Sequence, residues 1–322
     1  MKEPILIELP TFFGMKTVNS FLFKDPVPTL IDCGEGTPEV WAALKRALKE
    51  NGLEMKDIER VVITHAHVDH IGGAARLASE CGATIWVSDL VYDWALNRKH
   101  NWEKRGKIMM GTLSRFFDKN TFENILSLYH TMEKMIKKAW PPVPQSHLHL
   151  FDHEGIIELN GTEWQVLYMP GHSANQSCFF NPRNGHLLSA DMLLKVTPTP
   201  VMDTCKNAPT QRDKTIFKLL DSYQKIRQYD IRKIFPGHYD IFENATETID
   251  RQVERIHQRA EECYQLIANG THSFPDLGKA LYGNNLHLPA VNMIIGYLDL
   301  LEAQNRIFFE KNEVGTLLIF AN

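Results

Sequence analysis

The segment at residues 61–73, VVITHAHVDHIGG, constrains this chain more than any other feature. Apolar β-forming residues lead directly into His65, His67, Asp69 and His70. Side chains two apart in an extended segment point the same way, so the imidazoles of His65 and His67 can reach one point. Asp69 and His70 follow where the chain turns into a helix. Imidazole and carboxylate are ligands that zinc, iron and manganese accept, so the segment predicts a metal site.

Simpler interpretations of these residues exist. Asp69 could serve only as the N-cap of the following helix, and an isolated histidine is usually a surface or hydrogen-bonded residue. Four such residues at the end of one strand are improbable by chance, which favours metal binding. Gly72 and Gly73 follow at once, and because they lack a Cβ the first helical turn can pack closely against backbone.

Composition restricts the class of protein. The 322 residues are 43% hydrophobic and 23% charged, with a net charge of −4, as in ordinary soluble domains without an electrostatic preference for nucleic acid. The N-terminal sequence does not resemble a signal peptide, and no apolar run is long enough to cross a bilayer. Five scattered cysteines without a CxxC pair favour reduced thiols. We therefore expect a cytoplasmic protein that binds neither DNA nor a membrane.

The pattern of strands and helices divides the chain into parts. Residues 1–240 alternate strands and helices with tight hairpins, which favours a layered α/β sandwich over a parallel doubly wound sheet. Residues 89–140 instead carry apolar residues at helical spacing, and this insertion extends to about 145. Residues 244–322 are mostly helical and end in a predicted hairpin. The sequence thus predicts a catalytic domain at 1–243 and a C-terminal domain at 244–322.

Five short motifs, in order, carry a family resemblance. THAHVDHIGG resembles the HxHxDH signature of the metallo-β-lactamase superfamily. DCG at 32–34, PGHS at 170–173, SAD at 189–191 and PGH at 236–238 resemble its other motifs, each after an apolar β-like run. The resemblance implies a four-layered αββα sandwich.

The resemblance also implies two metal sites and a reaction. The first metal would be held by His65, His67 and His172, the second by Asp69, His70 and His238, with Asp191 bridging them. Two divalent ions, expected to be Zn2+ with iron or manganese as alternatives, would share a water and lower its pKa. The resulting hydroxide would attack the substrate, and Asp69 would orient it and carry its proton.

The spacing of the motifs is most similar to glyoxalase II and the lactamase-beta-2-like proteins. Asp191 stands where a zinc β-lactamase usually has cysteine, so penicillin hydrolysis is not expected. The C-terminal region resembles a small winged-helix domain, and its apolar positions predict a core of its own. Residues 288–305 contain no Lys or Arg, which argues against DNA binding and favours packing or a subunit contact.

Two further features bear on the substrate. Between residues 98 and 119 the insertion carries seven basic residues against two acidic ones, so it predicts a basic lid over the metals, with a homodimer contact as the alternative. As an insertion in a connection, it is expected to be removable without loss of folding. Lys195 would offer a cation to an anionic substrate, unless it is an ordinary surface lysine.

These features together predict a metal-dependent hydrolase acting on an ester or thioester of a small or amphiphilic anionic substrate. A phosphodiesterase or endoribonuclease is the first alternative, although the acidic net charge disfavours RNA. An iron-dependent redox enzyme, or a non-catalytic metal protein of the same fold, is the second. Because this fold hosts many chemistries, the sequence leaves the substrate open.

Overall fold

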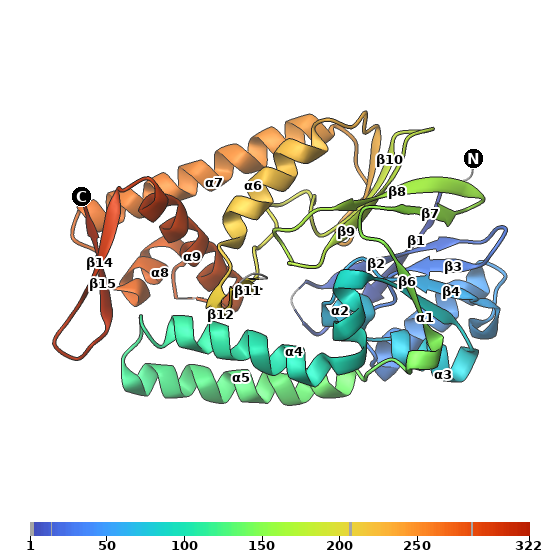
Figure 1. The fold of residues 1–322 in the computed structure, drawn as a ribbon, viewed down its shortest axis with the longest axis horizontal. Helices are drawn as coiled ribbons and strands as arrows, with labels where there is room; N and C mark the ends of the chain where they lie inside the picture. The colour runs from blue at the N-terminus through green and yellow to red at the C-terminus, as the bar shows by residue number, and fades with distance from the viewer. Residues whose placement is uncertain (1–2, 14, 206–207, 285) are drawn as a thin grey trace.

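Two β-sheets form the centre of the molecule in this computed structural model, which describes residues 3–13, 15–205, 208–284 and 286–322 (Figure 1). The first sheet has the strand order β1-β2-β3-β4-β5-β6 and the second β13-β10-β9-β8-β7. The first comprises β1 (Ile5–Pro10), β2 (Thr17–Phe23), β3 (Thr29–Ile31), β4 (Arg60–Val62), β5 (Thr84–Ser88) and β6 (Leu148–Phe151). The second comprises β7 (Ile156–Leu159), β8 (Thr162–Tyr168), β9 (Ser177–Asn181), β10 (His186–Ala190) and β13 (Lys233–Pro236).

Three apolar layers hold these sheets between helices. Strand residues alternate between layers: in β2, Phe21 and Phe23 face the second sheet, whereas Leu22 faces the helices of the first. Helices α1 (Pro38–Glu50), α2 (Val68–Ile71) and α3 (Ala74–Cys81) cover the first sheet, and α6 (Thr215–Ile226) covers the second. The predicted four-layered αββα sandwich is therefore confirmed.

Local signals in the sequence account for several element ends. The Thr37 side chain accepts a hydrogen bond from the Val40 amide and caps α1. The single helix expected after the histidine segment is instead split into α2 and α3 around Gly72. In the turn between β14 (Ile307–Lys311) and β15 (Leu317–Ala321), Asn312 Oδ1 accepts hydrogen bonds from two backbone amides, which confirms the predicted hairpin.

The insertion is a helical hairpin of α4 (Asp89–Leu113) and α5 (Lys119–Ala139) that lies along one side of the molecule (Figure 1). At its base, Trp94 stacks on Trp140, and both join the core under the first sheet. At its tip, Phe116 and Phe117 contact Phe274 of α8 (Phe274–Tyr282). The apolar face of this segment completes two cores of the same chain, which argues against the expectation that it could be removed without loss of folding.

The C-terminal helices do not form the separate small core that the sequence predicted. Residues 290–301 of α9 (Leu288–Ala303) are all buried, and α9 packs against α6, α7 (Ala245–Ala268) and α8. The apolar side chains of α9 belong to the same cluster as the outer face of the second sheet. The boundary at residue 243 stays a prediction, since the core is continuous across it. No helix in the described ranges combines the length and apolar character needed to span a membrane.

Candidate metal centre

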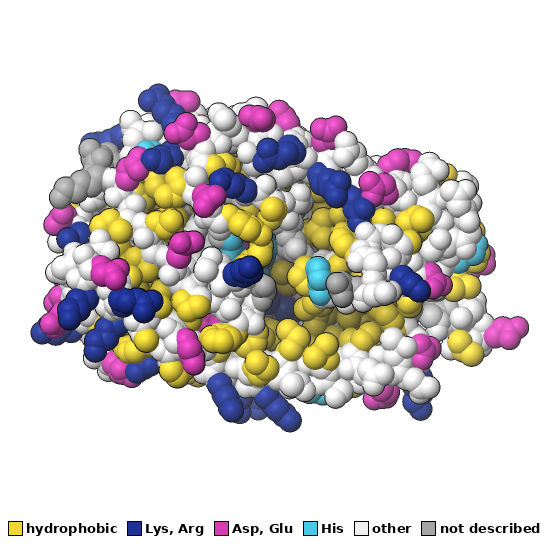
Figure 2. All heavy atoms as spheres, turned by 180° about the vertical axis from the view of Figure 1, so that it is seen from behind, with side chains coloured by type: hydrophobic (Ala, Val, Ile, Leu, Met, Phe, Trp, Pro, Cys, Tyr) yellow, Lys and Arg dark blue, Asp and Glu magenta, His cyan; other side chains and the backbone are white. Residues whose placement is uncertain are grey.

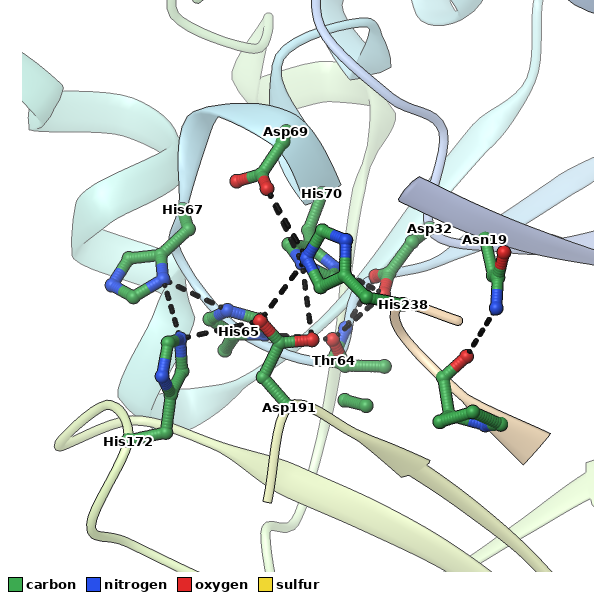
Figure 3. A network of polar contacts seen from close by, with 12 residues as sticks. Asn19, Asp32, Thr64, His65, His67, Asp69, His70, His172, Asp191 and His238 are labelled. Atoms are coloured by element: carbon green, nitrogen blue, oxygen red, sulfur yellow. Dashed lines mark hydrogen bonds and ion pairs between the residues drawn. The ribbon is translucent and has the colours of Figure 1, made fainter. Parts of the chain in front are cut away.

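The seven predicted ligands lie at one edge of the sandwich, in segments that follow four strands (Figure 3). Strands β3 and β4 are parallel, as are β10 and β13, so the residues that follow them emerge at the same edge. His65 follows β4, His172 follows β8, Asp191 follows β10 and His238 follows β13. Hydrogen bonds between the two halves hold the edge together: the Ser177 amide donates to the Thr64 carbonyl at 2.9 Å.

Three groups of ligand atoms each lie within 4.8 Å of one another. Asp191 lies between the two predicted metal sites, since its Oδ2 is 3.4 Å from His172 Nε2 and 3.2 Å from His238 Nε2. Its Oδ1 is 3.5 Å from His70 Nε2. The groups are His65, His67 and His172; Asp69, His70 and His238; and His65, His70 and Asp191.

The outer ring nitrogens fix which atoms of the histidines face the centre. A carbonyl or carboxylate oxygen accepts a hydrogen bond, so an imidazole nitrogen beside it carries the proton, and the other nitrogen then presents a lone pair inward. Three imidazoles have this arrangement, with Nε2 toward the centre. His172 Nδ1 lies 2.9 Å from the carbonyl oxygen of Thr199, and His238 Nδ1 lies 2.6 Å from that of Thr17. His70 Nδ1 lies 2.7 Å from Asp32 Oδ2.

Asp32 orients two of the predicted ligands, a role that the sequence did not predict beyond a structural motif. Its Oδ2 accepts a hydrogen bond from Thr64 Oγ1 at 2.8 Å as well as from His70. The Thr64 hydroxyl therefore accepts from His65 Nδ1, 3.0 Å away. Asp32 has a left-handed φ of 58°. The sequence signal was the DCG motif at 32–34, directly after an apolar strand.

The inward-facing atoms fit cations rather than one another. His70 Nε2 and Asp191 Oδ1 are buried and have no hydrogen-bond partner among the described residues. The Nε2 lone pair of His238 faces the carboxylates of Asp191 and, at 3.4 Å, Asp69. Such an arrangement is unfavourable unless a proton or a metal ion lies between the atoms. The donor set of imidazoles and carboxylates is one that divalent metals accept.

The protonation states separate the ligands into two groups. Burial lowers the pKa of His65, His67 and His172, which keeps them neutral and able to bind metal. Burial also opposes the charged forms of His70 and His238, but carboxylates led by Asp191 outweigh it. The pKa of His70 is raised well above its usual value, and that of His238 to about 10. In the metal-free protein, protons on these two rings offset the charge of the carboxylates.

Two glycines allow close approach at the centre. A Cβ on Gly237 would lie 2.2 Å from Asp191 Oδ1, and one on Gly72 would lie 2.5 Å from the Ala139 carbonyl oxygen at the end of α5. The expected close packing at Gly72 is thus confirmed, and its partner is the insertion.

Two other candidate residues lie elsewhere. Lys195 is exposed outside the buried ligand cluster, where its Nζ pairs with Asp240 Oδ2 at 2.8 Å, so its contact with substrate stays a prediction. Cys33 is buried next to Asp32, and burial raises the pKa of its thiol well above the usual value. A protonated, enclosed thiol is not a nucleophile, which agrees with a packing role.

Figure 2 shows a hollow in one face, bordered by hydrophobic side chains with a histidine at its edge.

Comparison with known proteins places this site in a family. The family model described as the metallo-beta-lactamase superfamily matches residues 16–238, which span the segments from β2 to the last predicted ligand. The chain belongs to the metallo-beta-lactamase superfamily. Relatives of this chain are named as metallo-hydrolases, and the protein is a metal-dependent hydrolase whose His and Asp groups imply divalent metals.

Relatives match along most of the chain. "Probable metallo-hydrolase YqjP" of Bacillus subtilis is 28% identical over 97% of this chain and 97% of its own length. "Beta-lactamase-like protein 2 homolog" of Caenorhabditis elegans is 23% identical, covering 82% and 70%. "Atrochrysone carboxyl ACP thioesterase" of Aspergillus fumigatus is 22% identical, covering 81% and 65%. The crystal structure of metallo-beta-lactamase family protein TTHA1429 from Thermus thermophilus superposes with a TM-score of 0.78 at 20% identity, covering 100% and 99%, which supports the fold.

Proposed function

We propose that this protein is a dinuclear metal-dependent hydrolase that cleaves an ester or thioester of a small or amphiphilic anionic substrate. The observation that carries the proposal is the arrangement of two ligand triads on either side of one buried carboxylate, Asp191. Each triad offers three protein ligands, which suits a catalytic ion that keeps a position open for water or substrate. Zinc is the expected metal.

The metals and the residues of the centre would have different roles in the reaction. When bound, the metals supply Lewis-acid activation of a water and of the scissile carbonyl. Asp69 is more exposed than Asp191, with 13% of its side chain accessible against 6% for Asp191. Burial raises the pKa of Asp69, but His70 and His238 outweigh it and lower the pKa overall, so this carboxylate is ionised. It is placed to accept a proton and to orient the attacking water.

The substrate class follows from the surroundings of the centre. Helix α4 contacts β11 (Thr204–Cys205) and β12 (Ala208–Arg212), which follow the segment that hydrogen-bonds to His172. This helix carries two buried arginines, Arg98 and Arg105, which suits a substrate with an anionic group. One relative is named as an acyl-carrier-protein thioesterase, and we extend that reaction type, not its substrate, to this chain.

We propose that the C-terminal unit is a winged-helix-like packing domain that does not read DNA. Helix α9, which would have to enter a groove, is enclosed by α6, α7 and α8. Its acidic residues pair within the chain: Asp299 binds Arg212 through two hydrogen bonds, and Glu302 binds Lys214 at 2.7 Å. Titration with duplex DNA at about 0.15 M salt should therefore give no binding.

The function is tested with metal-loaded protein and three probes: 4-nitrophenyl butyrate, butyryl-coenzyme A and bis(4-nitrophenyl) phosphate. We expect the ester or thioester to be hydrolysed, and His172→Ala to remove the activity. Faster cleavage of the phosphodiester would favour the nuclease alternative. No hydrolysis by fully metallated protein, together with oxygen consumption by an iron-loaded sample, would refute the proposal in favour of redox chemistry.

A further inference from the structure

The basic residues of the insertion differ sharply in their surroundings. Five of the seven lie on the surface, but Arg98 and Arg105 are buried, with 5% and 6% of their surfaces exposed. A buried guanidinium normally needs several hydrogen bonds to offset the loss of water, because it has five N–H donors and cannot lose its charge. What each arginine binds therefore indicates its role.

Arg105 has fewer partners than its burial requires. Its Nη2 lies 3.3 Å from Asp203 Oδ2, a single long contact rather than a two-pronged pair. The guanidinium carbon lies 4.3 Å from the centre of the Trp94 ring, which holds the plane of the group. Its Nε is buried and finds no acceptor among the residues that the structure describes. The group is thus oriented by an aromatic ring and left with an unused donor, Nε.

The same arginine is next to the metal centre. The segment from Thr199 to Asp203 connects the two: the Thr199 carbonyl accepts from His172 Nδ1, and the Val201 amide donates to the His172 carbonyl at 3.1 Å. Asp203 of this segment then contacts Arg105. One short segment therefore links this buried cation, which has an unused donor, to His172 of the first ligand triad.

We propose that Arg105 binds an oxyanion of the substrate, a carboxylate or a phosphate, and so places its acyl group over the metal centre. This inference rests on the proposed hydrolase function and names the residue that recognises the anion. An oxyanion of either kind matches the planar guanidinium with two parallel hydrogen bonds. Asp203 holds the guanidinium in place before substrate binds and competes with the substrate for it. If Arg105 were only a structural tie, removing either partner of the ion pair would have the same consequence.

The test compares two esters that differ by one carboxylate: mono-4-nitrophenyl glutarate and 4-nitrophenyl butyrate. In Arg105→Met we expect kcat/KM for the glutarate ester to fall about 10- to 100-fold, and that for the butyrate ester to change less than about 3-fold. Asp203→Asn keeps an acceptor for the Thr204 amide but removes the competing charge, so the glutarate ester should gain several-fold. Lys107→Met, which changes an exposed residue of the same helix, is the matched control and should alter neither ester.

The outcomes separate the alternatives. Equal losses on both esters in Arg105→Met, or losses of the glutarate ester in both Arg105→Met and Asp203→Asn, would overturn the proposal. If Arg105→Met does not fold, Arg105→Lys serves instead, because it keeps the charge but not the planar donor pair and should still lose selectivity. Inhibition of butyrate ester hydrolysis by propyl phosphate against that by butyrate then distinguishes phosphate from carboxylate as the preferred anion.

Failure of the hydrolase function would give a different pattern. If wild-type protein with full metal content hydrolyses neither ester, the proposed function fails, and anion binding is measured directly by calorimetry with glutarate. At matched metal content any binding of glutarate to the metals is common to all variants. A roughly 10-fold weaker affinity in Arg105→Met would still support Arg105 as the anion site, and an unchanged affinity would overturn it.

Discussion

The metal centre and the α4–α5 hairpin lie against each other but are built on different principles. The centre takes its ligands from short segments after four strands. The ligand cluster holds these side chains on the inner side, and partners such as Asp32 hold them on the outer side. The hairpin is two long helices, with a kink in α4 at Asn97, and it packs against the rest of the chain at its base, at its tip and along β11 and β12. The comparison indicates that the centre carries the chemistry, whereas the hairpin shapes the space around it and supports the fold.

The anchoring of the hairpin refines the expected lid. Its base joins the core of the first sheet and its tip contacts the C-terminal helices, where the Leu317 amide also donates to the Arg115 carbonyl at 2.7 Å. A segment held at both ends is better described as a fixed element than as a moving cover. Its inner apolar face needs no second subunit. Leu128 and Met135 of α5 remain 61% and 50% exposed, and a dimer contact there stays a prediction.

The largest difference between the two regions is expected from removing a ligand. His172→Ala or His65→Ala should lose metal and reduce activity by about 1,000-fold or more, since a metal-assisted reaction loses the ion itself. His130→Ala, an exposed histidine on the hairpin, should change neither quantity. Metal analysis and hydrolysis rates on the same samples check this, and full occupancy in both ligand variants would contradict the assignment.

A substitution at the hairpin tip should lower stability without changing metal content. Phe116 is 5% exposed and contacts Phe274 and Phe309, so Phe116→Ala should lower the free energy of unfolding by about 3–5 kcal/mol while metal content stays unchanged. Denaturant unfolding measures the loss, with Phe308→Ala on the more exposed wing as control. A loss of metal in the folded Phe116 variant would show that the two regions are not separable.

Asp32→Asn tests the outer support of the ligands. Asparagine tolerates the left-handed backbone of residue 32, but it removes the charge that holds His70 and, through Thr64, His65. We expect metal affinity to weaken about 10- to 100-fold. Competition with a chelator measures it, and Asp230→Asn, at an exposed ion pair, is the control. An affinity equal to that of the wild type would mean that the inner ligands orient themselves.

The smallest expected effect is the release of protons when metal binds. His70 and His238 have raised pKa values and are protonated in the metal-free protein at neutral pH, so metal binding there should release about two protons. The protonated ring of His238 also stabilises the metal-free fold below its ordinary pKa, and this contribution is lost as the pH rises through about 10. Calorimetry of metal binding in buffers of different ionisation enthalpy counts the protons. Binding that is independent of the buffer would contradict the assigned protonation.

The sequence alone determined the chemistry and its scaffold. The seven predicted ligands follow apolar strands, and both signals are local: strand periodicity sets which side chains share a face, and the histidine spacing sets which rings meet. The fold class, most element positions and the boundaries of the insertion followed in the same way. The motifs that hold the ligands are far apart in the chain, and it was their resemblance to the superfamily that implied that they meet at one centre.

Only the tertiary structure decided what depends on long-range packing. It selected two of seven basic residues for burial and placed Arg105 against Asp203, 98 residues away in sequence. It also merged the C-terminal helices into the core of the second sheet, where the apolar pattern of α9 had predicted a separate one. The physical reason is that an apolar pattern in the sequence predicts that a face will be buried, but it does not predict which element will cover it. That partner is decided only when distant elements pack together.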